Sequence, residues 1–530
     1  MRTVRQGTAD GQDCPVRDSP HMAKDASAAK VGREPVDDVV PESVSPAGTL
    51  PPLRYRDMPH AVPLRRMLGP SIILAGLALG SGEFILWPYI TYRSGFVFFW
   101  ACIVGVTLQF FINMEISRWA LATGESAVAG FCRLGRIWGW VFLFLTVIPH
   151  MVPAWAKGGA ELVSHLAFGD HQKHSEYVAI GGLLLCGLIL TLGPVVYRTV
   201  ERMQLILVSL IMFMVIALAI LLVRPDAVMA QAKGIMNVGG TPPADAGLDV
   251  AMLLGALAFA GAGGALNLGQ SNYIKDKGYG MGKYVGRITS PVTGEEEAIS
   301  ETGYLFRQTE SNIERFRSWW RKANTEHFLS FFITCLLCLV LLSLICYSVF
   351  YDAQGVRKND DYSKNNIEFV VGQSQAISGG TLGEFGRVAF LLMGVAILFT
   401  TEFGILDVAT RISTDLIKVN WLRSSRTWSE SRLYFLILWI TIGSGSLILL
   451  IGNDTVQNSL SLFKFVSALN GGVMALYCIT LLYINKRFLP PAARMNAWRT
   501  IMMLIATGFF GFFAVWASKI QIEKLNWLGG

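Results

Sequence analysis

The chain has 530 residues, of which 52% are hydrophobic and 16% are charged. Soluble domains usually carry about 25% charged residues, so this composition excludes an ordinary soluble protein. The formal net charge of +7 is small for this length and implies no nucleic-acid partner.

Residues 1–64 differ in composition from the rest of the chain. They are rich in Pro, Asp, Ser and Ala, carry charges of both signs and contain no apolar run. Segments of this kind bury too little apolar surface to fold, and a signal peptide would need the apolar stretch that they lack. We therefore expect a disordered cytoplasmic tail.

Apolar runs of about 20 residues recur after Arg66, and a helix of that length crosses a hydrocarbon core of about 30 Å. Lipid offers no partner to backbone groups outside a helix. We therefore predict an all-α integral membrane protein with about eleven spans, in a domain that covers residues 65–520. The spans are expected at 67–90, 96–122, 138–168, 178–196, 203–223, 250–273, 328–350, 385–418, 433–451, 460–484 and 500–517.

The loops between these spans alternate in their content of lysine and arginine. Cations are frequent before the first span and after the second, fourth, eighth and tenth spans, and they are sparse in the alternate loops. Short cytoplasmic loops are enriched in Lys and Arg. The amino terminus is therefore expected in the cytoplasm and the carboxyl terminus outside, with the chain embedded in the lipid of a plasma or inner membrane.

A long polar stretch, 276–326, separates the sixth and seventh spans. Within it, residues 315–322 alternate basic with aromatic side chains. This pattern fits a helix that lies on the membrane surface, and it fits a structured cytoplasmic cap equally well. Both interpretations stay open at this point.

The sequence carries no enzyme signature. The glycine-rich residues 278–283 lack the spacing of a phosphate-binding loop. Cys335 and Cys338 have the spacing of metal ligands, but they lie in an apolar helix without a second pair and are interpreted as small hydrophobic residues. We expect neither an enzyme, nor a disulfide framework, nor a bound cofactor.

Two apolar segments contain a glycine-rich interruption near their middle. The first is Gly-Ser-Gly-Glu at 80–83 and the second is Gly-Ala-Gly-Gly at 261–264. Because the sixth span comes five spans after the first, the two helices cross the membrane in opposite directions. Two inverted five-helix repeats, at about 67–223 and 250–484, with an extra helix at about 500–517, are typical of secondary transporters with broken helices. Glycines at this spacing also occur where continuous helices pack closely.

The residues around the first interruption resemble the Nramp divalent-metal transporters. Gly69-Pro70 precedes Gly80 at the spacing at which the family's Gly-Pro precedes Asp-Pro-Gly-Asn-Phe. The resemblance covers residues 65–520 in topology and implies a LeuT-like fold with broken first and sixth helices. The other matching residues are Leu108-Gln109, Arg118 and Thr123-Gly124 in the second span and Leu253-Leu254-Gly255-Ala256 in the sixth.

The chain departs from the family pattern where the metal would bind. Gly80 stands at the family's ligating Asp, and Glu83 stands at its ligating Asn. At the second interruption, Phe259, Ala260 and Gly261 stand at the family's Met, Pro and His. The thioether that would select transition metals is missing. The resemblance therefore implies the fold, whereas transport of manganese or iron does not follow from it.

Glu83 is the ionisable residue of the first interruption. An ionisable group inside a span costs about 2.5 kcal/mol or more on insertion scales, so each one marks a candidate site. We expect the Glu83 carboxylate to bind a cation, as the candidate metal ligand, or to carry a proton. A structural carboxylate bonded to unwound amides is the alternative. The backbone expected to complete the substrate site belongs to Gly80, Ser81, Gly82, Ala260, Gly261, Ala262 and Gly263.

The eighth span carries Glu402 well inside it, with Asp407 and Arg411 nearer its cytoplasmic end. Residues four apart share one helix face, so Asp407 and Arg411 are expected to form an intrahelical ion pair; otherwise they belong to a pathway for charge or protons. Glu402 has no such partner. We expect it to face the bundle interior, toward Glu83, as a second substrate-binding carboxylate.

The third span supplies His150 and Lys157. Histidine titrates near neutral pH, so His150 is a candidate proton carrier, and a hydrogen-bonded histidine at a helix kink is the alternative. Lys157 is four residues before Glu161 and is expected to pair with it, unless it serves as a built-in cation beside the pathway. In the sixth and tenth spans, Asn267 and Asn470 are expected either to line the pathway or to join helices.

These observations predict a secondary transporter, resembling the Nramp family, that moves a cation. A divalent and hard ion such as Mg²⁺ suits an all-oxygen site, and coupling to protons is one option. The alternative cargo is a small organic solute such as an amino acid, because glycine-lined breaks leave room and helix amino termini attract carboxylates. A third reading is a transporter-like receptor. The sequence leaves the oligomeric state open.

Overall fold

The computed structural model describes residues 39–80, 82–290, 292–293, 300, 302–358, 367–425, 427–451 and 459–528. The elements in these residues are helices and one two-stranded sheet. Within the described chain, nine helical segments are long and apolar enough to cross a membrane. They correspond to nine of the expected spans. The sixth expected span is divided into short helices, and the tenth is α17 (Ser459–Arg487).

The first five spans lie between residues 70 and 222. The first of them consists of α1 (Pro70–Ala78), the π-helical turn η2 (Gly82–Leu86) and α2 (Trp87–Ser94). The others, with the short helix α4, are α3 (Phe99–Thr123), α4 (Ala127–Cys132), α5 (Ile137–His150), α6 (Ala154–Phe168), α7 (Ser175–Leu192) and α8 (Val196–Leu222).

After α9 (Pro225–Met236) and η3 (Ala244–Ala246), the second half begins with a divided span. It consists of α10 (Val250–Ala258), the 3₁₀ turn η4 (Gly264–Leu268) and α11 (Gly269–Lys277). The remaining helical elements are η5 (Gly280–Tyr284), α12 (Glu310–His327), η6 (Phe328–Phe332), α13 (Ile333–Phe350), α14 (Glu368–Ser378), α15 (Gly383–Asn420), α16 (Glu430–Ile451), α17, η7 (Pro491–Ala493) and α18 (Ala497–Leu528).

Both expected helix breaks are present. α1 ends at Ala78 and helical structure resumes at Gly82, whereas α10 ends at Ala258 and the next turn begins only at Gly264. The second break requires glycine, because Gly263 and Gly264 have φ angles of 75° and 54°, which side chains other than glycine rarely adopt. The alternative of continuous, closely packed helices is therefore wrong.

The third expected span, predicted as one helix with a kink at His150 as one interpretation, is also divided. α5 ends at His150 and α6 begins at Ala154. Pro149 and Pro153 flank this interruption, and proline lacks the amide donor that a continuous helix needs. The division therefore follows from the two prolines.

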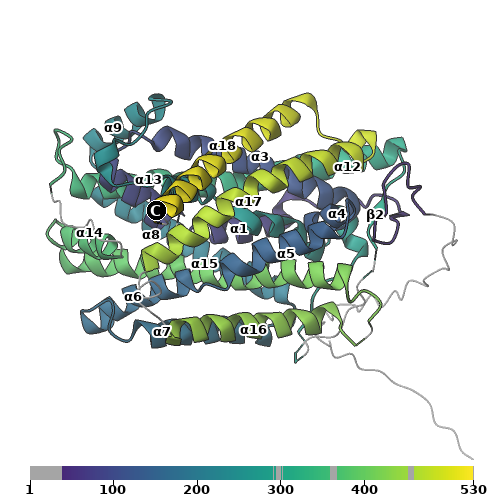
Figure 1. The fold of residues 1–530 in the computed structure, drawn as a ribbon, viewed down its shortest axis with the longest axis horizontal. Coiled ribbons are helices and arrows are strands. Elements are labelled where there is room, and N and C mark those ends of the chain that lie inside the picture. The colour runs from purple at the N-terminus through teal and green to yellow at the C-terminus, as the bar shows by residue number, and fades with distance from the viewer. Residues whose placement is uncertain are drawn as a thin grey trace, which may run out of the picture. The chain divides into compact units, whose positions relative to one another are not determined.

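α1, the first half of the first broken helix, lies in the middle of the bundle (Figure 1). Every residue of α1 is buried, and α1 packs against α8 and α15, while α10 packs against α17 and α18. The outer helices expose large apolar side chains, such as Phe213 on α8 and Leu447 on α16. Apolar surface of this extent is unusual for a protein in water and suits contact with lipid.

Part of the segment expected to be a disordered tail is folded. Residues 39–66 form a strap across one end of the bundle, and we call this end the N-terminal face (Figure 1). Leu53 and Met58 are fully buried, and β1 (Arg54–Tyr55) pairs in parallel with β2 (Tyr304–Leu305). The strap is held largely through its carbonyl oxygens, which accept from Arg133, Arg315, Trp319, Lys322 and Arg423. Residues 1–38 lie outside the described residues.

The described residues of the 276–326 segment fold as a cap on the N-terminal face, as one of the two interpretations expected. α12 continues through η6 directly into α13. Phe316 and Trp319 are buried, and the indole of Trp319 donates to the carbonyl of Pro59 at 2.9 Å. The alternation of basic and aromatic residues therefore reflects a helix with one face packed against the strap.

Candidate functional site

The two breaks touch each other at Gly82 and Phe259. A Cβ atom on Gly82 would lie 1.5 Å from the carbonyl oxygen of Phe259 and 2.5 Å from its carbonyl carbon. Only glycine therefore lets the backbone of the first break approach the second so closely. Gly80 lies in a similar way against Thr401 of α15.

The structure brings together the backbone residues that were expected at the substrate site. Because the breaks are in contact, they form one buried region between the halves of the chain. The described members, all buried, are Gly80, Gly82, Ala260, Gly261, Ala262 and Gly263. Ser81 lies outside the described residues.

Gln109 of α3 satisfies the backbone of the second break. Its Nε2 donates to the carbonyl oxygens of Ala258 at 2.7 Å and Leu257 at 3.3 Å, at the end of α10, where helical partners become scarce. Its Oε1 accepts from the amide of Gly263 at 3.4 Å and from the side chain of Asn267 at 3.3 Å. One side chain thus pairs backbone groups on both sides of the break.

Replacing Gln109 by leucine should destabilise the protein, because buried carbonyl groups lose their donor. Each buried polar group left unpaired costs about 1–3 kcal/mol. We expect a lower melting temperature and reduced transport, measured by thermal unfolding and by flux in proteoliposomes. The control is Gln375→Leu, because Gln375 is exposed on α14. Equal melting temperatures for the two variants would contradict this role of Gln109.

Unpaired polar atoms continue from the second break toward the N-terminal face. Asn267 donates to the hydroxyl of Tyr477 at 3.0 Å, but among the described residues its Oδ1 has no partner. Asn113 lies one turn beyond Gln109 on α3 and is fully buried, and neither of its side-chain polar atoms has a described partner. Buried polar groups normally have partners, so these atoms indicate a polar path.

Asn470 connects His150 to the backbone that follows the second break. Oδ1 of Asn470 accepts from the amide of Ala265 at 3.1 Å, and its Nδ2 lies 3.5 Å from Nε2 of His150. Nδ1 of His150 lies 2.7 Å from the carbonyl oxygen of Thr146, which places a proton on Nδ1 and leaves Nε2 as an acceptor in the neutral ring. His150 also lies at the kink between α5 and α6, as its alternative interpretation expected.

Glu83 is fully buried on η2, directly after the first break. Neither carboxylate oxygen has a hydrogen-bond partner on another residue of the described chain, so the expected alternative of a carboxylate bonded to unwound amides is not observed. η2 packs against α10 and α13. A buried carboxylate is costly unless a proton or a cation neutralises it. Glu83 is therefore the candidate group for binding a cation or a proton.

Glu402 has its hydrogen-bond partner in α6. Oε2 of Glu402 accepts a hydrogen bond from the backbone amide of Ala156 at 3.1 Å, in the first turn of α6. This hydrogen bond joins α15 to α6. The interruption between α5 and α6 frees amides in that turn, and Glu402 pairs one of them. A shared site for Glu402 and Glu83 therefore stays a prediction.

Lys157 pairs with a neighbouring helix and not with Glu161, which corrects the expected intrahelical pair. Its Nζ donates to the hydroxyl of Ser175 and to Oε1 of Glu176, each at 2.7 Å. Both partners lie at the start of α7. The buried ammonium of Lys157 therefore joins α6 to α7.

Asp407 and Arg411 form the expected ion pair, with Nε of Arg411 2.9 Å from both carboxylate oxygens. Asp276, at the end of α11, binds Nη1 of the same arginine. The hydroxyls of Tyr273 and Tyr434 donate to Asp407 at 3.0 and 2.6 Å. A buried network thus joins α11, α15 and α16.

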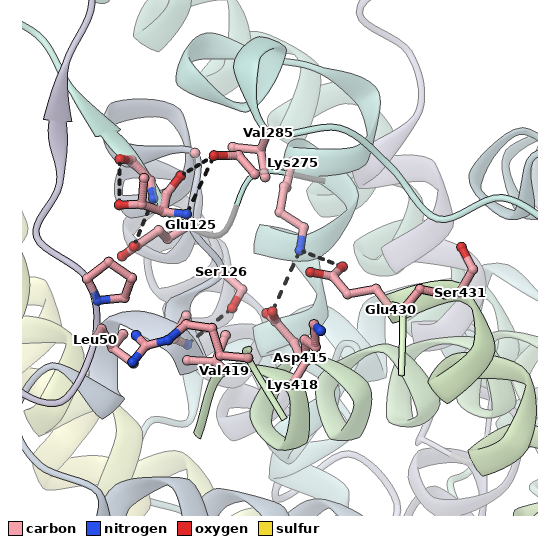
Figure 2. Close-up of a pocket in the computed structure, with 18 of the residues that line it drawn as sticks. Leu50, Glu125, Ser126, Lys275, Val285, Asp415, Lys418, Val419, Glu430 and Ser431 are labelled. Atoms are coloured by element: carbon pink, nitrogen blue, oxygen red, sulfur yellow. Dashed lines mark hydrogen bonds and ion pairs between the residues drawn. The ribbon is translucent and has the colours of Figure 1, made fainter. Parts of the chain in front are cut away.

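A cavity of about 520 Å³ lies beside this network at the N-terminal face. Figure 2 shows Lys275 of α11 pointing between Asp415 and Glu430, and its Nζ is 3.7 and 3.8 Å from their carboxylates. The strap supplies one wall through Leu50 and Pro51. α11 runs from the second break to this cavity. The cavity is therefore the candidate passage from the break to the N-terminal face.

Gln109 and Asn113 belong to the site although neither was predicted there. Gln109 entered only as part of a family motif, although an amide in the middle of an apolar span is itself a signal. Within the described residues, no group of three or more His, Cys, Asp or Glu side chains is arranged to hold a metal ion. The seven cysteines among them are buried and free.

No protein-family model matches the sequence, and no curated protein matches it. Solved structures match its fold. Two single-residue mutants of the Eremococcus coleocola manganese transporter, one histidine-to-alanine and one glutamate-to-glutamine, give TM-scores of 0.63 and 0.62. Each is 15% identical to this chain, over 88% of this chain and 90% of the other.

A third structure, of the same manganese transporter with an aromatic bis-isothiourea substituted compound, gives a TM-score of 0.60 at 14% identity over 92% of both chains. At such low identity the similarity establishes the fold. The resemblance to the Nramp family, inferred from the first, second and sixth spans, is thus confirmed for the architecture. The chain has a LeuT-like fold, in which two inverted five-helix repeats each begin with a broken helix.

Proposed function

We propose that the chain is a secondary transporter that moves a small cation across a cell membrane, with Glu83 as the group that neutralises it. The observation that carries this proposal is the position of Glu83, which is fully buried beside the first break and has no partner on another described residue. Broken helices offer free carbonyl oxygens near the middle of the membrane. The fold shared with a manganese transporter supports the proposal.

The residues of the site favour a hard cation. One carboxylate and the backbone carbonyls at the breaks form an all-oxygen set, which suits ions such as Mg²⁺. Phe259 stands at the position of the family's thioether and brings no soft ligand. Alternate binding of the cation and of a proton by Glu83 would couple the two movements.

The N-terminal face is proposed to lie in the cytoplasm, in agreement with the cations that flank alternate spans. The substrate would then leave the breaks past Asn113 and Asn267 and enter the cavity at Lys275, Asp415 and Glu430. Rocking of one group of helices against the other would open this route, as in transporters built from inverted repeats.

A small organic solute is the second candidate, and Trp155 favours it. The indole of Trp155 packs against Phe259, with the ring centroids 5.7 Å apart, and is almost fully buried. Within the described chain its Nε1 has no acceptor. A solute with a carboxylate or hydroxyl at the second break would supply the acceptor that this donor lacks.

Uptake into proteoliposomes separates the two candidates. The purified chain is tested with Mg²⁺, Mn²⁺, Na⁺ and a panel of amino acids, each with and without a pH gradient. Flux of a divalent cation is the expected result. Flux of an amino acid without any flux of metal would support the second candidate and remove the first.

Glu83→Gln is expected to reduce the flux to that of protein-free liposomes, because the amide keeps the shape of the side chain but cannot neutralise a cation. Glu384→Gln is the matched control, since Glu384 is a largely exposed glutamate that pairs with Arg387 on α15. If Glu83→Gln transported as fast as the control, Glu83 would not be the binding group.

A further inference from the structure

A second cluster of buried polar side chains lies at the beginning of α1, centred on Ser71. Its other members are Gln270 of α11 and Glu326 and His327 of α12. All four residues are at most 5% exposed. Neither the proposed substrate site nor the cavity at Lys275 includes any of them. The cluster joins one half of each broken helix to α12.

The hydroxyl of Ser71 uses its full hydrogen-bonding capacity. It donates to Oε2 of Glu326, and it lies 3.2 Å from Nε2 of Gln270 and 2.8 Å from Nδ1 of His327. A hydroxyl has one proton and can accept two hydrogen bonds. Since its proton is directed to Glu326, it accepts from Gln270 and from His327, and this places the proton of a neutral imidazole on Nδ1.

Each partner of Ser71 then has one acceptor left over. These are Oε1 of Glu326, Oε1 of Gln270 and Nε2 of His327, and each lacks a partner among the described residues. In each of these three side chains, the other polar atom binds Ser71. Unpaired buried acceptors are costly, and three of them around one hydroxyl call for a positively charged or proton-donating ligand.

The charged groups around the cluster are paired with one another. Lys277 of α11 binds Glu201 of α8, and the hydroxyl of Tyr279 donates to the carbonyl of Arg66. On the side of α3 and α18, Arg118 and Arg499 both bind Glu115. Among the described residues, the Glu326 carboxylate has no ion-pair partner of its own. The charge of Lys277, which Glu201 binds, still acts on it from α11.

We propose that Ser71, Gln270, Glu326 and His327 form the binding site of the coupling ion, a proton or Na⁺. Both ions are positively charged and bind to lone-pair acceptors of this kind. Ion binding would hold α1 and α11 against α12, and ion release would free the two half-helices to move. This role rests on the proposed transport function, because coupling requires a transported substrate.

Through its bond to Ser71, Glu326 also lies at the first turn of α1, where a carboxylate can act as a helix cap. A cap would stabilise the protein without responding to an ion. The test must therefore measure an ion response and not stability alone.

The test measures the melting temperature of the purified full chain while one ion is varied. In one series Na⁺ replaces choline at constant ionic strength and pH, and in the other the pH is varied without Na⁺. A ligand that binds only the folded state raises the melting temperature as its concentration rises. We expect wild type and the control Glu314→Gln, which changes an exposed residue of α12, to respond in one of the two series.

Glu326→Gln should lose that response, and Ser71→Ala should require about tenfold more of the same ion. Loss in the Na⁺ series identifies Na⁺, and loss in the pH series identifies the proton. A wild-type response that Glu326→Gln and Ser71→Ala both retain, or no wild-type response in either series, would overturn the site. If Glu326→Gln does not fold, Ser71→Ala alone decides.

This measurement is independent of the proposed transport function. If flux depends on Glu83 but Glu326→Gln keeps the wild-type ion response, the transport function stands and the coupling site falls. If the ion response is lost in Glu326→Gln although no substrate is transported, the ion site stands and the transport function falls.

Discussion

Gly82→Ala is expected to abolish transport and to destabilise the protein by about 3 kcal/mol or more. The added methyl group would lie 1.5 Å from the carbonyl oxygen of Phe259. Both atoms are attached to backbone, so no side-chain rotation can relieve the overlap, and the two breaks must separate. The measurements are the melting temperature of the purified protein and flux in proteoliposomes.

Gly472→Ala and Gly508→Ala are the matched controls for this substitution. Both glycines lie in helices, on α17 and α18, and a Cβ atom on either would meet nothing within 4 Å. Alanine is the better helix former by about 1 kcal/mol, so these variants should be as stable as wild type or more so. A Gly82→Ala variant that behaved like the controls would show that the breaks need not touch.

The positions of the breaks could be predicted from the sequence because their cause is local. Gly263 and Gly264 adopt φ angles that only glycine adopts easily, and glycine clusters in apolar segments are visible without any knowledge of neighbouring helices. The same holds for Asp407 and Arg411, whose spacing of four residues places them on one helix face. The positions of the breaks and one ion pair could therefore be predicted, because each depends on residues that are close together in the chain.

The partners of the other charged side chains could not be predicted, because they belong to other helices. Glu402 binds an amide that is free only because prolines interrupt the third span, and Lys157 binds the beginning of α7. Spacing along one helix identifies neighbours on that helix alone. Which residue a buried charge meets across a helix interface depends on how the helices pack.

The strap shows that amino-acid composition alone also fails to predict order that distant residues provide. Residues 39–66 contain few large apolar residues, and their composition predicts disorder. Their order comes from a surface that other parts of the chain provide, since Arg133, Trp319 and Lys322 donate to carbonyl groups of the strap. A proline-rich segment offers many acceptors and few donors, so donors on distant helices decide whether it folds.

Arg411→Leu is expected to destabilise the protein by about 3–5 kcal/mol, because it leaves buried carboxylates without their cation. Arg411 is 1% exposed and binds both Asp407 and Asp276. The melting temperature and the yield of folded protein measure the effect. Arg387→Leu, at an arginine of the same helix that pairs with the largely exposed Glu384, should change stability by less than about 1 kcal/mol.

The two carboxylates should respond differently once the arginine is gone. Asp407 keeps the hydroxyls of Tyr273 and Tyr434 as donors, whereas Asp276 loses the partner of its Oδ2, and its Oδ1 has none among the described residues. Adding Asp276→Asn to Arg411→Leu removes the uncompensated charge and should restore part of the lost stability. Asp276→Asn alone should destabilise, since it takes one carboxylate from the arginine. If the double variant were less stable than Arg411→Leu alone, the cost of removing Arg411 would not come from Asp276.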